Sequence, residues 1–400
     1  MRISKGVLIG ATVATFALGW LQKMPCHSAG WPYQRDLIFG QRCYSDLPVM
    51  FTARGLAEGI FPYAAGSGLE YPVISGLVMD LTARLTRVLA VGGPDANRTF
   101  VELTALLLLG CAIVTVLATA ATRGEPLDGL LVALAPVLAL TGIINWDLIA
   151  VALSSLAILA WTRERPVLAG ALIGLGTAAK LYPVLLLWPI VLLAIRTRQW
   201  RPAAQATGAA VAAWLVVNLP VAIAYPHGWG EFWRFNAERG ADFGSAWYAL
   251  EQLGHPVEPL NPIAIGLFAV LCLAIGGLAL RAPRPPPLAA LAFLTVAAFV
   301  VTNKVYSPQY VLWLLPLAAL ARPSIVELLL WQAAEVLYWF AVWHYLATGD
   351  QAYYPAATFL RIAATLWLML RIAQCTWSLR HVAPSDEYAT QPSATTSKAT

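Results

Sequence analysis

Charged residues are scarce in this sequence, since Asp, Glu, Lys and Arg make up only 12% of its 400 residues. A soluble domain usually carries about 25%, so the composition excludes an ordinary soluble protein. Hydrophobic residues account for 59%. They form continuous runs, which favours membrane helices over a barrel. The net charge of +5 comes with Arg residues scattered between the apolar runs and does not indicate a nucleic-acid partner. The sequence therefore predicts an all-α polytopic membrane protein.

Cysteine and histidine are also scarce, with five of each. No CxxC pair and no His-rich pattern is present, so no metal site is predicted. Cys26 and Cys43 share the first polar segment and can pair as a disulfide if that segment is extracytoplasmic. The other three, Cys111, Cys272 and Cys375, fall in apolar runs and are interpreted as packing residues.

The order of apolar and basic segments predicts the topology. Arg2 and Lys5 precede the first apolar run, 6–21, and place the N-terminus in the cytoplasm. This run is either a signal peptide or a retained helix, and we favour the retained helix because no clear small-x-small cleavage site follows it and the rest of the chain is polytopic. The further expected spans are 99–121, 127–142, 146–161, 166–180, 182–195, 203–224, 262–280, 287–302, 308–321, 324–346 and 356–377. Basic clusters occur in every second connection, so all of them are cytoplasmic only if 22–98 stays outside as one unit.

Within 22–98, residues 73–91 have apolar side chains at helical spacing with charged residues between them, as in an amphipathic helix. Such a helix either spans the bilayer or lies in its interface. The charge pattern favours an in-plane helix, which gives twelve spans and two cytoplasmic termini. The transmembrane domain is then 1–380, with a second extracytoplasmic loop at 225–261. The tail, 381–400, is rich in Ser, Thr, Ala and Pro and is predicted to be disordered and cytoplasmic.

With this topology, the unusual polar residues gather on the extracytoplasmic side. They include Asp46 in the first loop, Asn145-Trp-Asp147, Lys180-Leu-Tyr-Pro183 and the stretch 303–310. A one-sided concentration of polar groups indicates a site at the outer leaflet. The alternative, a transporter or flippase, would more often carry polar residues at mid-membrane depth.

Each polar candidate has a structural and a functional interpretation. Asp46, isolated among aromatic residues and prolines, is either a solvated loop residue or a general base. Lys180 and Lys304 are either snorkelling lysines or cations that bind a lipid phosphate. Asn145 and Asp147 either cap the helix that follows them or take part in the site.

Two further patterns lie within apolar segments. Glu327 and Glu335 are acids on one helical face, and a buried acid in a membrane is usually functional or paired with a neighbouring Arg. Gly170 and Gly174 form a GxxxG pattern, which predicts close helix packing.

An ordered set of short stretches supplies a resemblance. In chain order they are Tyr44-Ser-Asp46, Pro62-Tyr63, Glu70-Tyr71-Pro72, Asn145-Trp-Asp147, Lys180-Leu-Tyr-Pro183 and Asn303-Lys-Val-Tyr306-Ser-Pro-Gln309-Tyr310. Together they resemble the integral-membrane GT-C glycosyltransferases. The resemblance is greatest to glycosyltransferase family 87, bacterial mannosyltransferases that use polyprenyl-phosphate mannose. It covers most of 1–378 and depends on the order of the stretches, since no single stretch is highly specific.

The resemblance implies a GT-C fold with a cytoplasmic N-terminus and an in-plane helix in the first outer loop, which agrees with the about twelve transmembrane helices expected from the charge pattern. It implies a multi-pass protein of the plasma (inner) membrane with an extracytoplasmic active site. The implied reaction is inverting transfer of a hexose, expected to be mannose, from a polyprenyl-phosphate sugar to a glycolipid or glycan acceptor. No cofactor is implied, and a single acid in place of a DxD pair fits the metal-independent branch.

The resemblance also implies roles for particular residues. Asp46 matches the catalytic acid near the start of the first loop, which deprotonates the acceptor hydroxyl. Stabilisation of the leaving phosphate requires positive charge, for which the candidates are Lys180, Lys304, His227 and Arg239. The residues expected to bind the acceptor or the sugar are Tyr44, Glu70, Tyr71, Asn145, Asp147, Tyr306 and Gln309.

Overall fold

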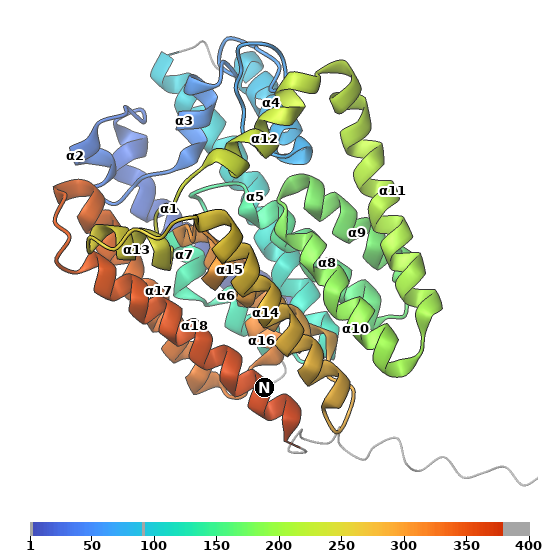
Figure 1. Ribbon diagram of the computed structural model, residues 1–400. Helices are drawn as coiled ribbons and strands as arrows, with labels where there is room; N and C mark the ends of the chain where they lie inside the picture. Colours follow the sequence, from blue (N-terminus) through green and yellow to red (C-terminus); the bar gives the residue numbers. More distant parts are fainter. Residues whose placement is uncertain (1–2, 90–92, 379–400) are drawn as a thin grey trace, which may run out of the picture.

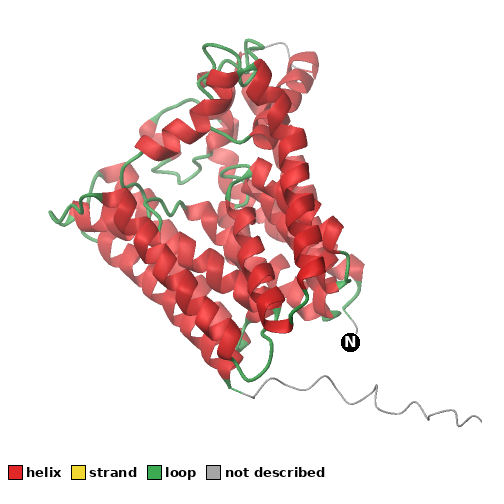
Figure 2. Ribbon diagram, turned by 45° about the vertical axis from the view of Figure 1, so that its right-hand side comes forward, coloured by secondary structure: helices red, strands yellow, loops and turns green. Residues whose placement is uncertain are grey.

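The computed structural model describes residues 3–89 and 93–378, and within these ranges it is α-helical with no strand (Figure 2). The predicted tail, 381–400, lies outside the described residues. The long apolar helices are α1 (Lys5–Ser28), α5 (Gly93–Arg123), α11 (Trp200–Ala224), α14 (Leu260–Arg281), α17 (Ile325–Thr348) and α18 (Tyr354–Trp377). These six are long and apolar enough to cross a membrane. The all-α, polytopic class is therefore confirmed.

Shorter apolar helices complete the bundle. They are α8 (Asp147–Thr162), α9 (Pro166–Ala179), α10 (Leu187–Thr197) after the 3-10 turn η1 (Tyr182–Leu186), α15 (Leu288–Thr302), and α16 (Val311–Ala321) after the turn η2 (Pro308–Tyr310). Helices α15 and α16 are buried along almost their whole length. A helix of 15 residues, such as α15, is only about 22 Å long, less than the ~30 Å of a hydrocarbon core. The backbone beyond the end of so short a helix lies within the hydrocarbon core. It is tolerated there where protein or a water-filled cavity satisfies its polar groups.

One end of the bundle carries most of the non-spanning elements. Figure 1 shows α2 (Arg35–Ile38), α3 (Asp46–Ala53), α4 (Val73–Leu89) and α12 (Pro226–Glu238) at the top, called here the upper end, with the start of α1 at the bottom. Helix α13 (Ala246–Gln252) follows α12. The expected amphipathic helix corresponds to α4, which has buried and lipid- or solvent-exposed faces. Its in-plane orientation and the total of twelve spans stay predictions.

Three of the expected segments differ from the observed helices by more than three residues or are divided. Helix α1 continues from the expected end at residue 21 to Ser28, because Gln22 and Lys23 donate hydrogen bonds to the carbonyls of Arg42 and Tyr44. Helix α5 begins at Gly93 instead of residue 99. The expected span 127–142 consists of two short helices, α6 (Pro126–Ala133) and α7 (Pro136–Thr141), because Pro136 cannot continue a helical hydrogen-bond ladder and starts the second one.

The GxxxG pattern packs α9 against α11. A Cβ added at Gly170 would lie 2.0 Å from the carbonyl oxygen of Ala206, and one at Gly174 would lie 2.2 Å from that of Ala210. Neither helix can accept a larger side chain at this contact without moving apart. The prediction of close helix packing is therefore confirmed.

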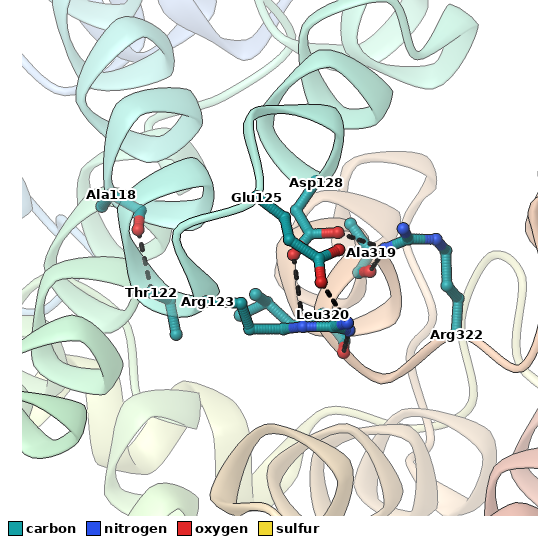
Figure 3. Close-up of polar contacts among 8 residues, drawn as sticks. All are labelled: Ala118, Thr122, Arg123, Glu125, Asp128, Ala319, Leu320 and Arg322. Atoms are coloured by element: carbon teal, nitrogen blue, oxygen red, sulfur yellow. Dashed lines mark hydrogen bonds and ion pairs between the residues drawn. The ribbon is translucent and has the colours of Figure 1, made fainter. Parts of the chain in front are cut away.

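A charged cluster joins the helices at the lower end of the bundle (Figure 3). The buried carboxylate of Asp128, on α6, pairs with Arg322 after α16 and lies 3.6 Å from Nε of Arg123. Arg123 also donates to the carbonyl of Leu320 at 3.0 Å. Because α16 begins at the upper end and finishes here, this cluster fixes its far end.

Candidate active site

A cavity of about 650 Å³ lies at the upper end of the bundle. Its charged lining residues are Arg35, Asp46, Glu70, Lys180, Arg239 and Asp242. The predicted site residues that line it are Tyr44, Asp46, Glu70, Tyr71, Asn145, Lys180, Arg239 and Gln309. The fold thus brings together parts of the first loop, the loop after α12 and three breaks between helices. These breaks lie between α7 and α8, between α9 and η1, and between α15 and η2.

Asp46 is the first residue of α3 and is held by two neutral donors. Its Oδ1 accepts a hydrogen bond from the Tyr44 hydroxyl at 2.5 Å, and its Oδ2 accepts one from Asn145 Nδ2 at 2.6 Å. The same Asn145 amide lies 2.6 Å from the hydroxyl of Tyr71. Among the described residues, no Lys, Arg or His forms an ion pair with Asp46. The carboxylate is therefore oriented but not neutralised.

The backbone around Asp46 is fixed to the break between α7 and α8. The Asp46 N–H donates to the Ile144 carbonyl at 2.8 Å, and the Ser45 hydroxyl donates to the Ile143 carbonyl at 2.7 Å. Ser45 also caps α3 by accepting from the N–H of Leu47. As a result, the segment that carries the acid is attached to the turn that carries Asn145.

Helix α1 holds the same segment from the other side. The buried Lys23 donates to the Tyr44 carbonyl at 2.7 Å. The structure joins Cys26 of α1 to Cys43 by a disulfide. These contacts connect α1 to the two residues before Ser45, so the acid is held between α1 and the α7–α8 break.

The surroundings of Asp46 change its acidity. Burial raises the pKa of the Asp46 carboxyl above its usual value, and the hydrogen bonds from Tyr44 and Asn145 oppose that rise. Burial and the negative charge of Asp46 also raise the pKa of Tyr44, which keeps its hydroxyl protonated as a donor. A carboxylate with a raised pKa is a stronger base, which suits proton abstraction.

Lys180 occupies the break between α9 and η1. Its Nζ lies 3.3 Å from Oδ2 of Asp147 and 5.1 Å from the centre of the Tyr71 ring. Asp147, which is fully buried, also accepts from Trp313 Nε1 at 2.6 Å. Lys180 lines the cavity, whereas Asp147 lies behind it. Asp147 therefore acts on the cavity through Lys180.

The other predicted cations lie in different places. Arg239, after α12, lines the cavity and forms an ion pair with Asp242, Nε to Oδ2 at 2.9 Å. Lys304 does not line the cavity and donates to Asn261 Oδ1 at 2.8 Å. His227 is exposed in the first turn of α12, away from the cavity lining. Of the four predicted phosphate ligands, Lys180 and Arg239 reach the cavity.

The predicted sugar ligands are also divided. Glu70 lines the cavity but forms a two-point ion pair with Arg54, at 3.0 and 2.9 Å. Tyr306 lies outside the cavity lining, because its hydroxyl donates to the buried Glu335 at 2.8 Å. Gln309 lines the cavity and is only 5% exposed, and its Oε1 has no hydrogen-bond partner among the described residues.

Several cavity residues were not predicted from the sequence. Trp343, near the end of α17, lies against Tyr44 at 5.5 Å between ring centres and against Phe39 at 6.0 Å. Arg35 lines the cavity and donates to the Leu346 carbonyl at 2.8 Å. These contacts depend on the pairing of α2 with the distant α17, and no local pattern in the sequence signals it.

The comparison with protein-family models decides the family. The model described as glycosyltransferase family 87 matches residues 70–302, more than half of the chain. The chain belongs to glycosyltransferase family 87. As a member of this family it is a membrane glycosyltransferase, in agreement with the apolar helices and the resemblance noted above. A search of curated proteins found no match.

The matched range of family 87 includes only part of the cavity lining. Asn145, Lys180 and Arg239 lie inside the range, whereas Asp46 and Gln309 lie outside it. In the described parts of the chain, no group of three or more His, Cys, Asp or Glu residues is arranged to hold a metal ion.

Proposed function

We propose that this family 87 enzyme transfers a hexose, expected to be mannose, from a polyprenyl-phosphate sugar to a glycolipid or glycan acceptor. The observation that carries the proposal is the Asp46 carboxylate, which faces a cavity whose lining also includes the cations Lys180 and Arg239. A base and a separate anion-binding group are what an inverting displacement from a lipid phosphate requires. The site would lie on the extracytoplasmic face of the plasma membrane.

In the proposed reaction, Asp46 takes the proton of an acceptor hydroxyl. The oxygen attacks the anomeric carbon, and the bond between that carbon and the phosphate oxygen breaks with inversion. The electron pair leaves with the lipid phosphate, which gains one negative charge. Tyr44 and Asn145 hold the carboxylate in place during the proton transfer.

The charge that develops on the phosphate requires stabilisation more than protonation, because a phosphate is a good leaving group. Lys180 is suited to this as a compact, strongly hydrated charge. Its contacts with Asp147 and the Tyr71 ring fix its position. Arg239 is the second candidate, oriented by Asp242.

The acceptor is proposed to lie beside Asp46 against aromatic side chains. Phe39, Tyr44 and Trp343 have ring centres 5.5 to 6.0 Å apart and form one side of the cavity. Flat apolar faces next to a base suit the stacking of a sugar ring. Family membership favours this use of the cavity over the transporter alternative.

The test is transfer of labelled mannose from polyprenyl-phosphate mannose to membrane acceptors. Asp46→Asn preserves the shape of the side chain but removes the base, so transfer is expected to fall by about 10²- to 10⁴-fold. The matched control is Asp80→Asn, which changes a carboxylate of α4 that pairs with Arg84 and does not line the cavity. Equal transfer by wild type and Asp46→Asn at equal expression removes Asp46 from the mechanism. If wild type transfers a different lipid-linked sugar only, the donor assignment is wrong while the role of Asp46 stands.

A further inference from the structure

Two Glu–Arg ion pairs join α17 to α18, and they differ in what else they touch. Arg361 Nε lies 2.7 Å from Glu335 Oε2, and both side chains are buried. Arg371 Nε lies 2.6 Å from Glu327 Oε1, and Arg371 is 41% exposed. We infer that Glu335 and Arg361 are positioning residues, which fix the part of the cavity that holds the lipid-phosphate donor. This inference rests on the function proposed above.

Arg361 holds the backbone that leads into η2. Its Nη1 donates to the Tyr306 carbonyl at 2.6 Å, and its Nη2 donates to the Ser307 carbonyl at 3.3 Å. The guanidinium carbon lies 3.3 Å from the centre of the Tyr306 ring and 4.2 Å from that of Tyr338. Glu335 completes the arrangement by accepting from the Tyr306 hydroxyl. The ion pair therefore binds residues 306–307 through backbone and side chain together.

A second loop is attached to the same backbone. The Asp242 N–H donates to the Lys304 carbonyl at 2.8 Å, and the Tyr306 N–H donates to the Phe243 carbonyl at 3.1 Å. Gly244, at φ +79°, has no room for a side chain, since a Cβ would lie 2.0 Å from the Tyr306 carbonyl oxygen. Residues 242–245 and 303–310 thus form one unit, called here the loop wall.

The loop wall supports both of the cations proposed to bind phosphate, Lys180 and Arg239. On one side, Tyr310 stacks on Trp313 with ring centres 3.8 Å apart, and Trp313 donates to Asp147, the partner of Lys180. On the other side, Asp242 pairs with Arg239. A displacement of the loop wall therefore moves the partners of the two groups proposed to bind phosphate. Misplacement by about 1 Å is enough to lower activity by about 10²-fold in enzymes.

Stability alone gives a weaker account of this pair. Burying an ion pair carries a large desolvation free energy. Apolar side chains of similar volume in place of the pair often stabilise a fold equally well or better. A role limited to joining α17 and α18 is also served by Glu327 and Arg371, which do not line the cavity. The distinguishing feature of Glu335 and Arg361 is their set of contacts with the loop wall.

The two pairs provide a matched experiment on the purified full chain. Arg361→Lys keeps the charge but cannot reproduce the forked contacts with two carbonyls, whereas Arg371→Lys makes the same change on the same helix away from the cavity. We expect Arg361→Lys to raise KM for polyprenyl-phosphate mannose by about 10-fold or more. The pH profile should stay unchanged, because the Asp46 carboxylate is held by Tyr44 and Asn145, which lie outside the loop wall. Arg371→Lys is expected to leave KM unchanged. Equal changes in KM for both variants, or a loss of thermal stability alone, would overturn the inference.

A milder variant covers the case in which Arg361→Lys does not fold. Tyr306→Phe removes the hydrogen bond to Glu335 but keeps the ring and both carbonyl contacts, and it is expected to raise the donor KM by about 3-fold. An unchanged KM in a folded Tyr306→Phe protein counts against the inference.

Binding of polyprenyl phosphate separates this inference from the proposed function. If wild type transfers no mannose, the proposed donor is wrong, and binding of polyprenyl phosphate is measured by its effect on thermal denaturation. Weaker binding by Arg361→Lys than by Arg371→Lys still supports a positioning role for the pair. Equal binding by the two variants, or no binding even by wild type, overturns it.

Discussion

Replacing Lys180 with Met removes a positive charge from the cavity and from the buried Asp147 at the same time. Asp147 is fully buried, and its described partners are Lys180 at 3.3 Å and Trp313 at 2.6 Å. Removal of one partner of a buried ion pair typically destabilises a protein by about 3–5 kcal/mol. Lys180→Met is therefore expected to lower the denaturation temperature by several degrees and to abolish sugar transfer.

A double variant separates the two effects. In Lys180→Met with Asp147→Asn, the buried charge is gone and the Asn carbonyl oxygen can still accept from Trp313. Replacement of both charges by neutral groups is often close to neutral in stability. We expect the double variant to regain the denaturation temperature of wild type and to remain inactive, because the cavity still lacks the positive charge of Lys180.

The assays are thermal denaturation in detergent and mannosyl transfer at matched expression. Recovery of transfer by the double variant would refute the phosphate-binding role of Lys180, because its task would then be limited to neutralising Asp147. A Lys180→Met protein as stable as wild type would refute the ion-pair part of the reasoning instead. Asp147→Asn alone is the reference for the loss of the acid.

Two further predictions concern the base and the helix packing. Asn145→Ala removes a hydrogen bond that favours the charged form of Asp46, so the pKa of the Asp46 carboxyl rises further. The acid limb of the kcat/KM profile is then expected to move to higher pH, which a pH titration of activity measures. An unmoved limb contradicts the assignment of Asp46 as the base. Gly174→Ala places a Cβ 2.2 Å from a backbone oxygen of α11 and is expected to lower the yield of folded protein, whereas Gly266→Ala on α14, with nothing within 4 Å, is expected to leave it unchanged.

Much of the fold follows from local patterns in the sequence. The apolar runs predict the helices because a segment in a bilayer must satisfy the hydrogen bonds of its own backbone, which a helix does. The GxxxG pattern predicts close packing because small residues let another backbone approach, whereas the identity of the partner helix, α11, comes only from the structure. The ends of helices were harder to predict, since α1 extends to Ser28 through contacts with residues 42–44, which are distant in the sequence.

The candidate site was predictable where its residues stand out from their neighbours. Asp46, Asn145 and Lys180 are polar residues beside long apolar runs, and all three line the cavity. Tyr306 belongs to the same kind of stretch, yet it faces a buried ion pair, and the sequence does not show on which side of a loop a residue lies. Trp343 lies within an apolar helix and carries no local signal. The open alternatives for Glu327 and Glu335 are settled as pairs with Arg371 and Arg361.

The attachment of Asp46 to the α7–α8 break has a consequence for substrate exchange. Its N–H donates a hydrogen bond to the Ile144 carbonyl, and its carboxylate accepts one from Asn145. The backbone and the side chain of Asp46 are therefore both fixed to the same turn of the bundle. The aromatic surface beside it comes instead from Phe39, which follows α2, from Tyr44, and from Trp343 of α17. Under the proposed function, substitutions at Phe39 or at the end of α17 would change the surface offered to the acceptor without displacing the Asp46 carboxylate.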